Sequence, residues 1–429
     1  MPIVRRLAPA ALAACGVVLL LYAFVAFRAL PQMLDIHREC RMSYMFPRYF
    51  DHTDEVKKYA SSSQPALRRY KLYNYREGNF IAPGRTAEIR RSAVPALFIP
   101  GNAGSYGQVR SLASSTLQQY WDPDEHYPWP EFVRSRGPVE WWTIDFNEDF
   151  SALSGRILED QAWYVNEVIR YLRTIYVVPG NNMYMSGEQN MSITLLGHSM
   201  GGIAARLALQ MPNYTPGSVD TIVTLATPHA FPPVSFDRSI ESVYSRVNKP
   251  ADTPLPLIVS LAGGLLDVQL SSDASSLSLG RLHHPDARLS SYTASVASLW
   301  SGIDHIAVVW CDQLRTRIAR ALLLDVLFFD MEASARAQPH MIQQRRSLWR
   351  TILGLPLEAT SPREHMAALE ASSAGPMEMR FMSNPQVTYL RGPHGITNTS
   401  DGSTITYVLS SPGPGYRHDI DPAEAEASE

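Results

Sequence analysis

A serine flanked by glycines is the feature of this sequence that most directly indicates chemistry. Residues 197–201 read Gly-His-Ser-Met-Gly, a pattern in which the serine lies on a strained turn between a strand and a helix. An apolar run at 192–196 and a helical pattern at 200–211 supply that context. The pattern therefore predicts that Ser199 is a nucleophile, and we expect His198 inside the turn to be structural.

A serine hydroxyl needs a base, an orienting carboxylate and donors for the developing oxyanion, because it is a weak nucleophile alone. In proteins with this turn the acid and the base follow the serine in that order. Asp267 comes shortly after an apolar run at 256–261 and a glycine pair. His305 lies between a strand-like run, Val296–Trp300, and an apolar segment at 306–329. Position therefore favours Asp267 as the acid and His305 as the base.

Other residues compete for both roles. Asp273 and Asp304 are alternatives for the acid. His229 follows a predicted strand but precedes every plausible acid, and the pair at 283–284 lies in a predicted lid loop near the serine-rich stretch 271–278.

The oxyanion requires two backbone donors. One is expected from Met200, the residue after the nucleophile, and the other from the loop after an earlier strand. Residues 100–104 read Pro-Gly-Asn-Ala-Gly after a predicted strand at 93–99, which makes Asn102 or Ala103 the expected second donor. No Gly-Lys-Ser/Thr follows, so these glycines do not favour a phosphate-binding loop.

The elements that position these residues alternate between strands and helices. Such alternation predicts an α/β-hydrolase fold, with a mostly parallel sheet and helices on both faces. Charges nearly balance at a net −3, which gives no basic surface for nucleic acid. We expect no metal and no cofactor. The predicted strands cover 70–76, 93–99, 141–146, 192–196, 221–226 and 256–261, and the predicted helices cover 108–119, 158–176 and 200–211.

The N-terminal region indicates a membrane segment. Residues 7–27 form an uncharged run of 21 residues after Arg5 and Arg6. At about 1.5 Å per residue this run spans the roughly 30 Å hydrocarbon layer, whereas a cleaved signal usually has an apolar stretch of about 7–15 residues. We therefore expect a single transmembrane signal anchor with a cytosolic N-terminus at 1–6 and a lumenal body. A long cleaved signal is the alternative.

Both alternatives place the body in the secretory pathway, where disulfides form. Cys15 lies in the apolar run, so Cys40 and Cys311 are the possible disulfide, with two free thiols as the alternative. Sequons at Asn190, Asn213 and Asn398 suggest N-glycosylation.

The remaining chain divides by composition into four segments. We expect a wrapping segment at 28–69, a catalytic domain at 70–330, a C-terminal extension at 331–411 and a disordered acidic tail at 412–429. The apolar segment at 306–329 contains arginines, so it favours a long packed helix over a second membrane span.

Short stretches in order along the chain resemble the GPI inositol-deacylases, lumenal membrane lipases of the endoplasmic reticulum. The ordered set is more specific than any one stretch. It comprises residues 40–45, 70–73, 100–105, 145–148, 197–202, 227–229, 263–267 and 304–311.

This resemblance implies a serine esterase that removes the acyl chain from the inositol of glycosylphosphatidylinositol (GPI). Ser199 would be the nucleophile, Asp267 the acid and His305 the base. GPI lipid or GPI-anchored proteins would be the substrate, in the endoplasmic reticulum membrane. Family members continue into further membrane spans, and none is visible after Phe329. A lipase for other lipid esters and a non-catalytic adaptor for exporting GPI-anchored cargo therefore stay open.

Overall fold

A computed structural model of the chain describes most of residues 40–355 and three later strands. The predicted segments 1–6 and 412–429, and nearly all of the predicted anchor at 7–27, lie outside the described residues. No helix among the described residues combines the length and apolar composition that crossing a bilayer requires. The described residues are 16, 19–21, 24, 40, 42, 44–60, 64–78, 93–123, 129–176, 192–249, 256–277, 287–328, 333–355, 378–382, 387–391 and 407–410.

An eight-stranded sheet forms the centre of the fold, in the order β1-β2-β4-β3-β5-β6-β7-β8. β1 and β2 are antiparallel at one edge, and the six strands from β4 to β8 in that order pair in parallel. The mostly parallel sheet of an α/β-hydrolase is therefore confirmed. The strands are β1 (Pro47–Asp51), β2 (Lys71–Glu77), β3 (Val94–Ile99), β4 (Val139–Asp145), β5 (Ile193–His198), β6 (Val219–Leu225), β7 (Leu257–Ala262) and β8 (Arg288–Tyr292).

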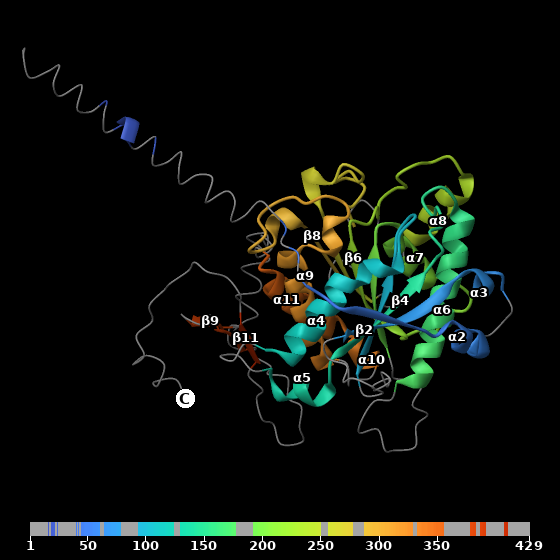
Figure 1. Cartoon of the computed structure of the whole chain (residues 1–429), viewed down its shortest axis with the longest axis horizontal. Helices are drawn as coiled ribbons and strands as arrows, with labels where there is room; N and C mark the ends of the chain where they lie inside the picture. Colours follow the sequence, from blue (N-terminus) through green and yellow to red (C-terminus); the bar gives the residue numbers. More distant parts are fainter. Residues whose placement is uncertain are drawn as a thin grey trace, which may run out of the picture.

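Helices cover both faces of the sheet, as Figure 1 shows. α4, α9 and α11 pack together on one face, and α6, α7 and α8 pack on the other. The central strands β3, β5 and β7 are buried along their whole length, which explains their continuous apolar sequences. The helices are α2 (Thr53–Tyr59), α3 (Ala66–Arg69), α4 (Arg110–Trp121), α5 (Glu131–Arg136), α6 (Gly155–Ile175), α7 (Met200–Ala208), α8 (Arg238–Val247), α9 (Asp312–Asp325), α10 (Ala333–Arg336) and α11 (Pro339–Leu353).

Two predicted elements near the expected base are wrong. The run Val296–Trp300 forms turns, and the edge strand is β8, which ends at Tyr292. The apolar segment at 306–329 is not one helix, because a 3₁₀ turn at Ala307–Val309 precedes α9. Apolar composition indicates burial here but does not distinguish a buried turn from a strand or helix.

The packed domain is wider than the predicted 70–330. β1 pairs with β2 along its length, inside the predicted wrapping segment 28–69. α11 packs on α9 in the predicted extension 331–411, with Trp349 fully buried. The later strands Glu378–Met382, Val387–Arg391 and Tyr407–Ser410 form a separate antiparallel sheet.

A buried ion pair attaches α11 to the rest of the domain. The Arg345 guanidinium donates to both Asp325 carboxylate oxygens, at 3.0 and 2.7 Å. It also reaches Asp220 and Thr221 at the start of β6. These carboxylates raise the pKa of Arg345, against the effect of burial. Because a buried arginine resembles a surface residue in sequence, composition alone does not assign this helix to the domain.

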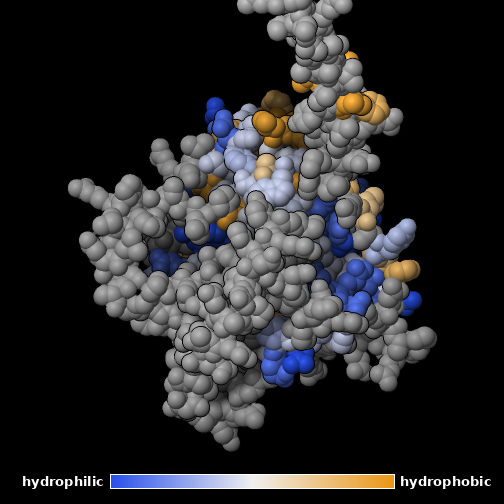
Figure 2. All heavy atoms as spheres, turned by 90° about the vertical axis from the view of Figure 1, so that its left-hand side faces the viewer, coloured by the Kyte–Doolittle hydropathy of each residue, from blue (hydrophilic) through white to orange (hydrophobic). Residues whose placement is uncertain are grey.

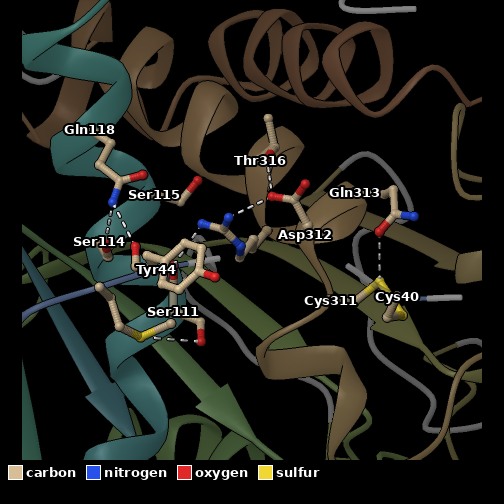
Figure 3. Close-up of polar contacts among 12 residues, drawn as sticks. Cys40, Tyr44, Ser111, Ser114, Ser115, Gln118, Cys311, Asp312, Gln313 and Thr316 are labelled. Atoms are coloured by element: carbon tan, nitrogen blue, oxygen red, sulfur yellow. Dashed lines mark hydrogen bonds and ion pairs between the residues drawn. A yellow bond between two sulfur atoms is a disulfide. The ribbon is translucent and has the colours of Figure 1, made fainter. Parts of the chain in front are cut away.

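A disulfide joins Cys40 to Cys311, with their Cα atoms 4.8 Å apart. Figure 3 shows Tyr44 lying against α4, where Gln118 Nε2 donates to the Tyr44 carbonyl at 3.2 Å. Cys311 immediately precedes α9 and follows His305 by only six positions. The bond therefore fixes the N-terminal segment close to the loop that carries the expected base.

Replacing Arg345 with methionine tests whether α11 is integral to the domain. The change leaves the buried Asp325 carboxylate without its cation, so the free energy of unfolding is expected to fall by about 3–5 kcal/mol in urea titrations. The control is Lys57→Met, which removes an exposed ion pair with Asp54 and is expected to leave the transition almost unchanged. Equal stability of the Arg345→Met and parent proteins would contradict this assignment.

Candidate active site

Ser199 occupies a sharp turn between β5 and α7. Its backbone has φ of 52° and ψ of −125°, a conformation that L-residues rarely adopt. The glycines around it allow close backbone contacts. A Cβ atom on Gly197 would lie 2.5 Å from the Gly202 backbone, and one on Gly201 would lie 2.1 Å from the Ile99 oxygen. The Gly-X-Ser-X-Gly pattern is thus a packing requirement at this position.

The loop after β3 lies directly against this turn. A Cβ atom on Gly101 would be 2.7 Å from Ser199 Cβ and 3.3 Å from the Met200 nitrogen. The Asn102 side chain accepts a hydrogen bond from the Ala152 nitrogen at 2.9 Å, which attaches the loop to the segment after β4. The structure therefore brings together the two segments expected to supply oxyanion donors.

The hydrogen bonds of this loop distinguish between its two candidate donors. The Ala103 N–H donates to the Asp149 carbonyl at 3.0 Å, so the expectation that it serves the oxyanion is wrong. The residue has φ of 50°, which turns its N–H toward this internal acceptor. The Asn102 and Met200 N–H groups have no hydrogen-bond acceptor among the described residues. These two groups form the better donor pair.

Asp267 and His305 are in contact at the carboxyl-terminal edge of the sheet. The His305 Nδ1 atom lies 2.9 and 3.1 Å from the two Asp267 carboxylate oxygens, and both side chains are buried. The carboxylate also accepts from the nitrogens of Gln269 and Leu270, at 3.1 and 2.9 Å. Since a carboxylate accepts, Nδ1 carries the proton and Nε2 is left as the basic atom.

The competing acids and bases are engaged elsewhere. The Asp304 carboxylate accepts from the nitrogens of Ile306 and Ala307, both at 2.9 Å, and so stabilises the turn of the loop that carries His305. Asp273 makes no contact with His305. His229 is fully buried between Thr224 and Arg206, and burial lowers its pKa well below the usual value. The histidines at 283–284 lie outside the described residues.

No hydrogen bond joins His305 to Ser199 among the described contacts, and the His305 ring lies 5.0 Å from the ring of His198, the residue before the nucleophile. The link between their segments is His198, whose Nε2 atom lies 2.9 Å from the His305 carbonyl oxygen. Catalytic hydrogen bonds are often long before substrate binds, so this arrangement remains compatible with proton transfer from Ser199. No local sequence pattern indicates the His198 contact, because the two residues are 107 positions apart.

The arrangement has the parts required for acyl transfer. It holds a serine on a strained turn, two unpaired backbone donors beside it, and a buried carboxylate–imidazole pair formed by residues of two other loops. Such a set can attack an ester carbonyl and stabilise the tetrahedral oxyanion that results.

Of the three sequons, the structure describes only Asn213. Its Nδ2 atom donates to the Trp163 carbonyl at 3.0 Å and to the Glu167 carboxylate at 2.8 Å. A glycan on this nitrogen would displace one of these bonds, so the structure disfavours glycosylation at Asn213. Asn190 and Asn398 lie outside the described residues.

Comparison with known proteins gives consistent matches. A family model described as "PGAP1-like alpha/beta domain" matches residues 90–324. A GPI inositol-deacylase of Debaryomyces hansenii is 38% identical over 314 residues, covering 68% of this chain and 29% of that protein. A GPI inositol-deacylase of Neurospora crassa is 38% identical over 326 residues, covering 71% of this chain and 24% of that protein.

The chain thus spans less than a third of the length of these two relatives. Among solved structures, it is similar to Aspergillus fumigatus lipase B, with 12% identity and a TM-score of 0.38 over 71% of this chain and 70% of that one.

Substitution of Gly101 with alanine tests the contact between the β3 loop and the serine turn. The added methyl group would meet Ser199 and push the Asn102 donor away, so hydrolysis of a soluble short-chain ester is expected to fall about 10²-fold or more. The matched control is Gly107→Ala in the 3₁₀ turn Tyr106–Val109 that follows this loop, where a Cβ atom finds ordinary contacts of 3.5 and 3.8 Å. Equal rates for the two folded variants would refute the expected clash.

Proposed function

Because the chain belongs to the PGAP1-like alpha/beta domain family, we propose that it is a serine esterase that removes the acyl chain from the inositol of GPI. The observation that carries this proposal is the buried Asp267–His305 pair beside the Ser199 turn. The relatives named GPI inositol-deacylase support the choice of ester.

The proposed reaction proceeds through an acyl-enzyme. His305 Nε2 takes the Ser199 proton as the serine oxygen attacks the acyl carbonyl, and Asp267 stabilises the imidazolium that forms. The N–H groups of Asn102 and Met200 donate to the tetrahedral oxyanion. His305 then returns the proton to the departing inositol oxygen. Water, activated by the same imidazole, releases the fatty acid from Ser199.

Exposed apolar side chains around the site support a lipid substrate. They lie on loops after parallel strands, at the edge that carries Asp267 and His305. Figure 2 shows hydrophobic residues grouped toward the top of the face that it draws. Such grouping is typical of surfaces that meet lipid or other apolar partners. The exposed residues on these loops are Phe150, Leu153, Phe231, Phe236, Leu265, Leu266, Val268, Trp300 and Ile306, and Tyr292 at the end of β8 is exposed beside them.

We also propose that the domain faces the lumen of the endoplasmic reticulum, anchored by residues 7–27. The Cys40–Cys311 disulfide supports an oxidising compartment. Arg5 and Arg6 before the apolar run favour a cytosolic N-terminus. GPI lipid and GPI-anchored proteins in the lumenal leaflet would then be the substrates.

The nucleophile is tested by replacing Ser199 with alanine in the full chain, purified in detergent. Fatty acid release from GPI with an acylated inositol is expected to fall by at least about 10³-fold, because no acyl-enzyme can form. Ser290→Ala, on the exposed face of β8, is the control and should keep full activity. Unchanged release by Ser199→Ala would rule out the mechanism.

The same assay separates the alternatives for substrate. Faster turnover of glycerolipid esters than of acyl-inositol GPI would indicate a general lipase. GPI binding without turnover by the unmodified protein would indicate an adaptor.

The role of the exposed apolar side chains around the site is tested with a Leu265→Ser/Phe236→Ser double variant. These two side chains are 95% and 84% exposed and lie on different loops. Turnover of acyl-inositol GPI in vesicles is expected to fall about tenfold, since each buried CH₂ contributes about 0.8 kcal/mol to lipid contact, while a soluble ester is hydrolysed normally. Tyr59→Ser, at the end of α2, removes an exposed aromatic ring beside Tyr171 and serves as the control. Equal losses on vesicles and soluble ester would argue against a lipid-contact role.

A further inference from the structure

His198 connects the segment of the nucleophile to the segment of the base. It is the last residue of β5 and immediately precedes Ser199. Its Nε2 atom lies 2.9 Å from the backbone oxygen of His305, and the two imidazole rings are 5.0 Å apart. The side chain is only 2% exposed, so this contact is shielded from water.

The contact defines the protonation state of His198. A carbonyl oxygen only accepts, so Nε2 carries the hydrogen. Burial lowers the pKa of His198 to about 4, and the nearby His305 imidazole contributes to the same shift. Its Nδ1 atom is buried and has no hydrogen-bond partner among the described residues. His198 is therefore a neutral donor at neutral pH.

A neutral donor suits this position, because the proposed reaction turns His305 into a cation. A second cation 5.0 Å away would oppose that step, whereas a neutral imidazole does not. Asp267, on the other side of His305, supplies the compensating negative charge.

Several hydrogen bonds hold the backbone of the base loop, residues 301–311, which carries His305. The Ile303 nitrogen donates to the Gly263 carbonyl at 2.9 Å, which joins the base loop to the segment that carries Asp267. The Asp304 carboxylate caps the turn that follows, within the loop itself. Among these contacts, that of His198 connects the loop to the residue before the nucleophile.

We propose that His198 is a positioning residue that places the basic nitrogen of His305 within reach of the Ser199 hydroxyl. This inference rests on the proposed esterase function. Because Ser199 directly follows His198 at the buried end of β5, the hydrogen bond sets the position of the base loop relative to the nucleophile. A misplacement of about 1 Å can cost about 10² in rate, so the bond is expected to affect kcat more than substrate binding.

The test compares His198→Met, which lacks the donor, with His198→Gln, which places an amide N–H near the position of Nε2. On a soluble short-chain ester, kcat is expected to fall about 10- to 100-fold in the methionine variant, with KM within about twofold. The glutamine variant should recover most of the loss. A normal kcat in the methionine variant, or equal losses in both variants, would overturn the proposal.

The matched control is Asn74→Leu, which removes another buried side-chain donor to a backbone carbonyl, that of Trp141 at 3.1 Å. It is expected to lower the unfolding midpoint without lowering kcat. If the methionine variant does not fold, His198→Asn replaces it, because its amide is one methylene too short to reach; the same loss and the same glutamine recovery are expected. Activity that survives in a parallel Ser199→Ala sample would instead refute the proposed function itself.

Discussion

The structure depends on a backbone conformation that a serine adopts only under constraint. Ser199 has a positive φ, which costs on the order of 1–3 kcal/mol, and its surroundings hold it there. Its nitrogen donates to the Leu225 carbonyl at 2.8 Å, and its own carbonyl accepts from the Gly202 nitrogen at 3.0 Å. Glycine at 197, 201 and 202 lets β3, β5 and the loop after β6 approach without side chains between them. The serine, which is half-buried, is thereby held at the sheet edge on a rigid support.

The other site residues reach Ser199 from separate loops, and the parallel sheet makes this possible. Carboxyl ends of parallel strands meet at one edge, so the loops after β3, β7 and β8 converge on the loop after β5. Buried polar contacts then fix the loops. The Gly263 carbonyl joins the loops of the acid and the base, and the disulfide at Cys311 joins the base loop to the N-terminal segment.

A buried arginine has a similar role beneath the site. Arg206 of α7 is fully buried, and burial lowers its pKa to about 10. Its guanidinium donates to the carbonyls of His229 and Val247, at 3.3 and 2.7 Å, and to the Asn248 side chain. These bonds attach the loop after β6 and the end of α8 to the helix that follows the nucleophile. The Thr-Pro-His stretch at 227–229 therefore stabilises the support of the site, and His229 is not a base.

The central strands and the Ser199 turn are predictable from the sequence, because continuous apolar runs are typical of buried strands and a glycine-flanked serine between a strand and a helix is typical of this turn. The choice of Asp267 and His305 follows from chain order, and the structure places them in contact. The sequence does not show whether Asn102 or Ala103 is the second oxyanion donor, because that depends on which backbone N–H is already bonded within the protein. It also does not reveal α11, whose attachment depends on the buried Arg345, or the contact of His198, which forms between distant segments.

The most direct test of the central claim is labelling of the folded full chain with a fluorophosphonate, followed by mass spectrometry of its peptides. Fluorophosphonates react with serines that an adjacent base activates and that oxyanion donors serve, so the probe reports the assembled site rather than any one residue. We predict a single adduct on Ser199 in the native protein, and no adduct when the protein is denatured before the probe is added. Absence of an adduct in the folded protein, or an adduct on a different serine, would contradict this claim.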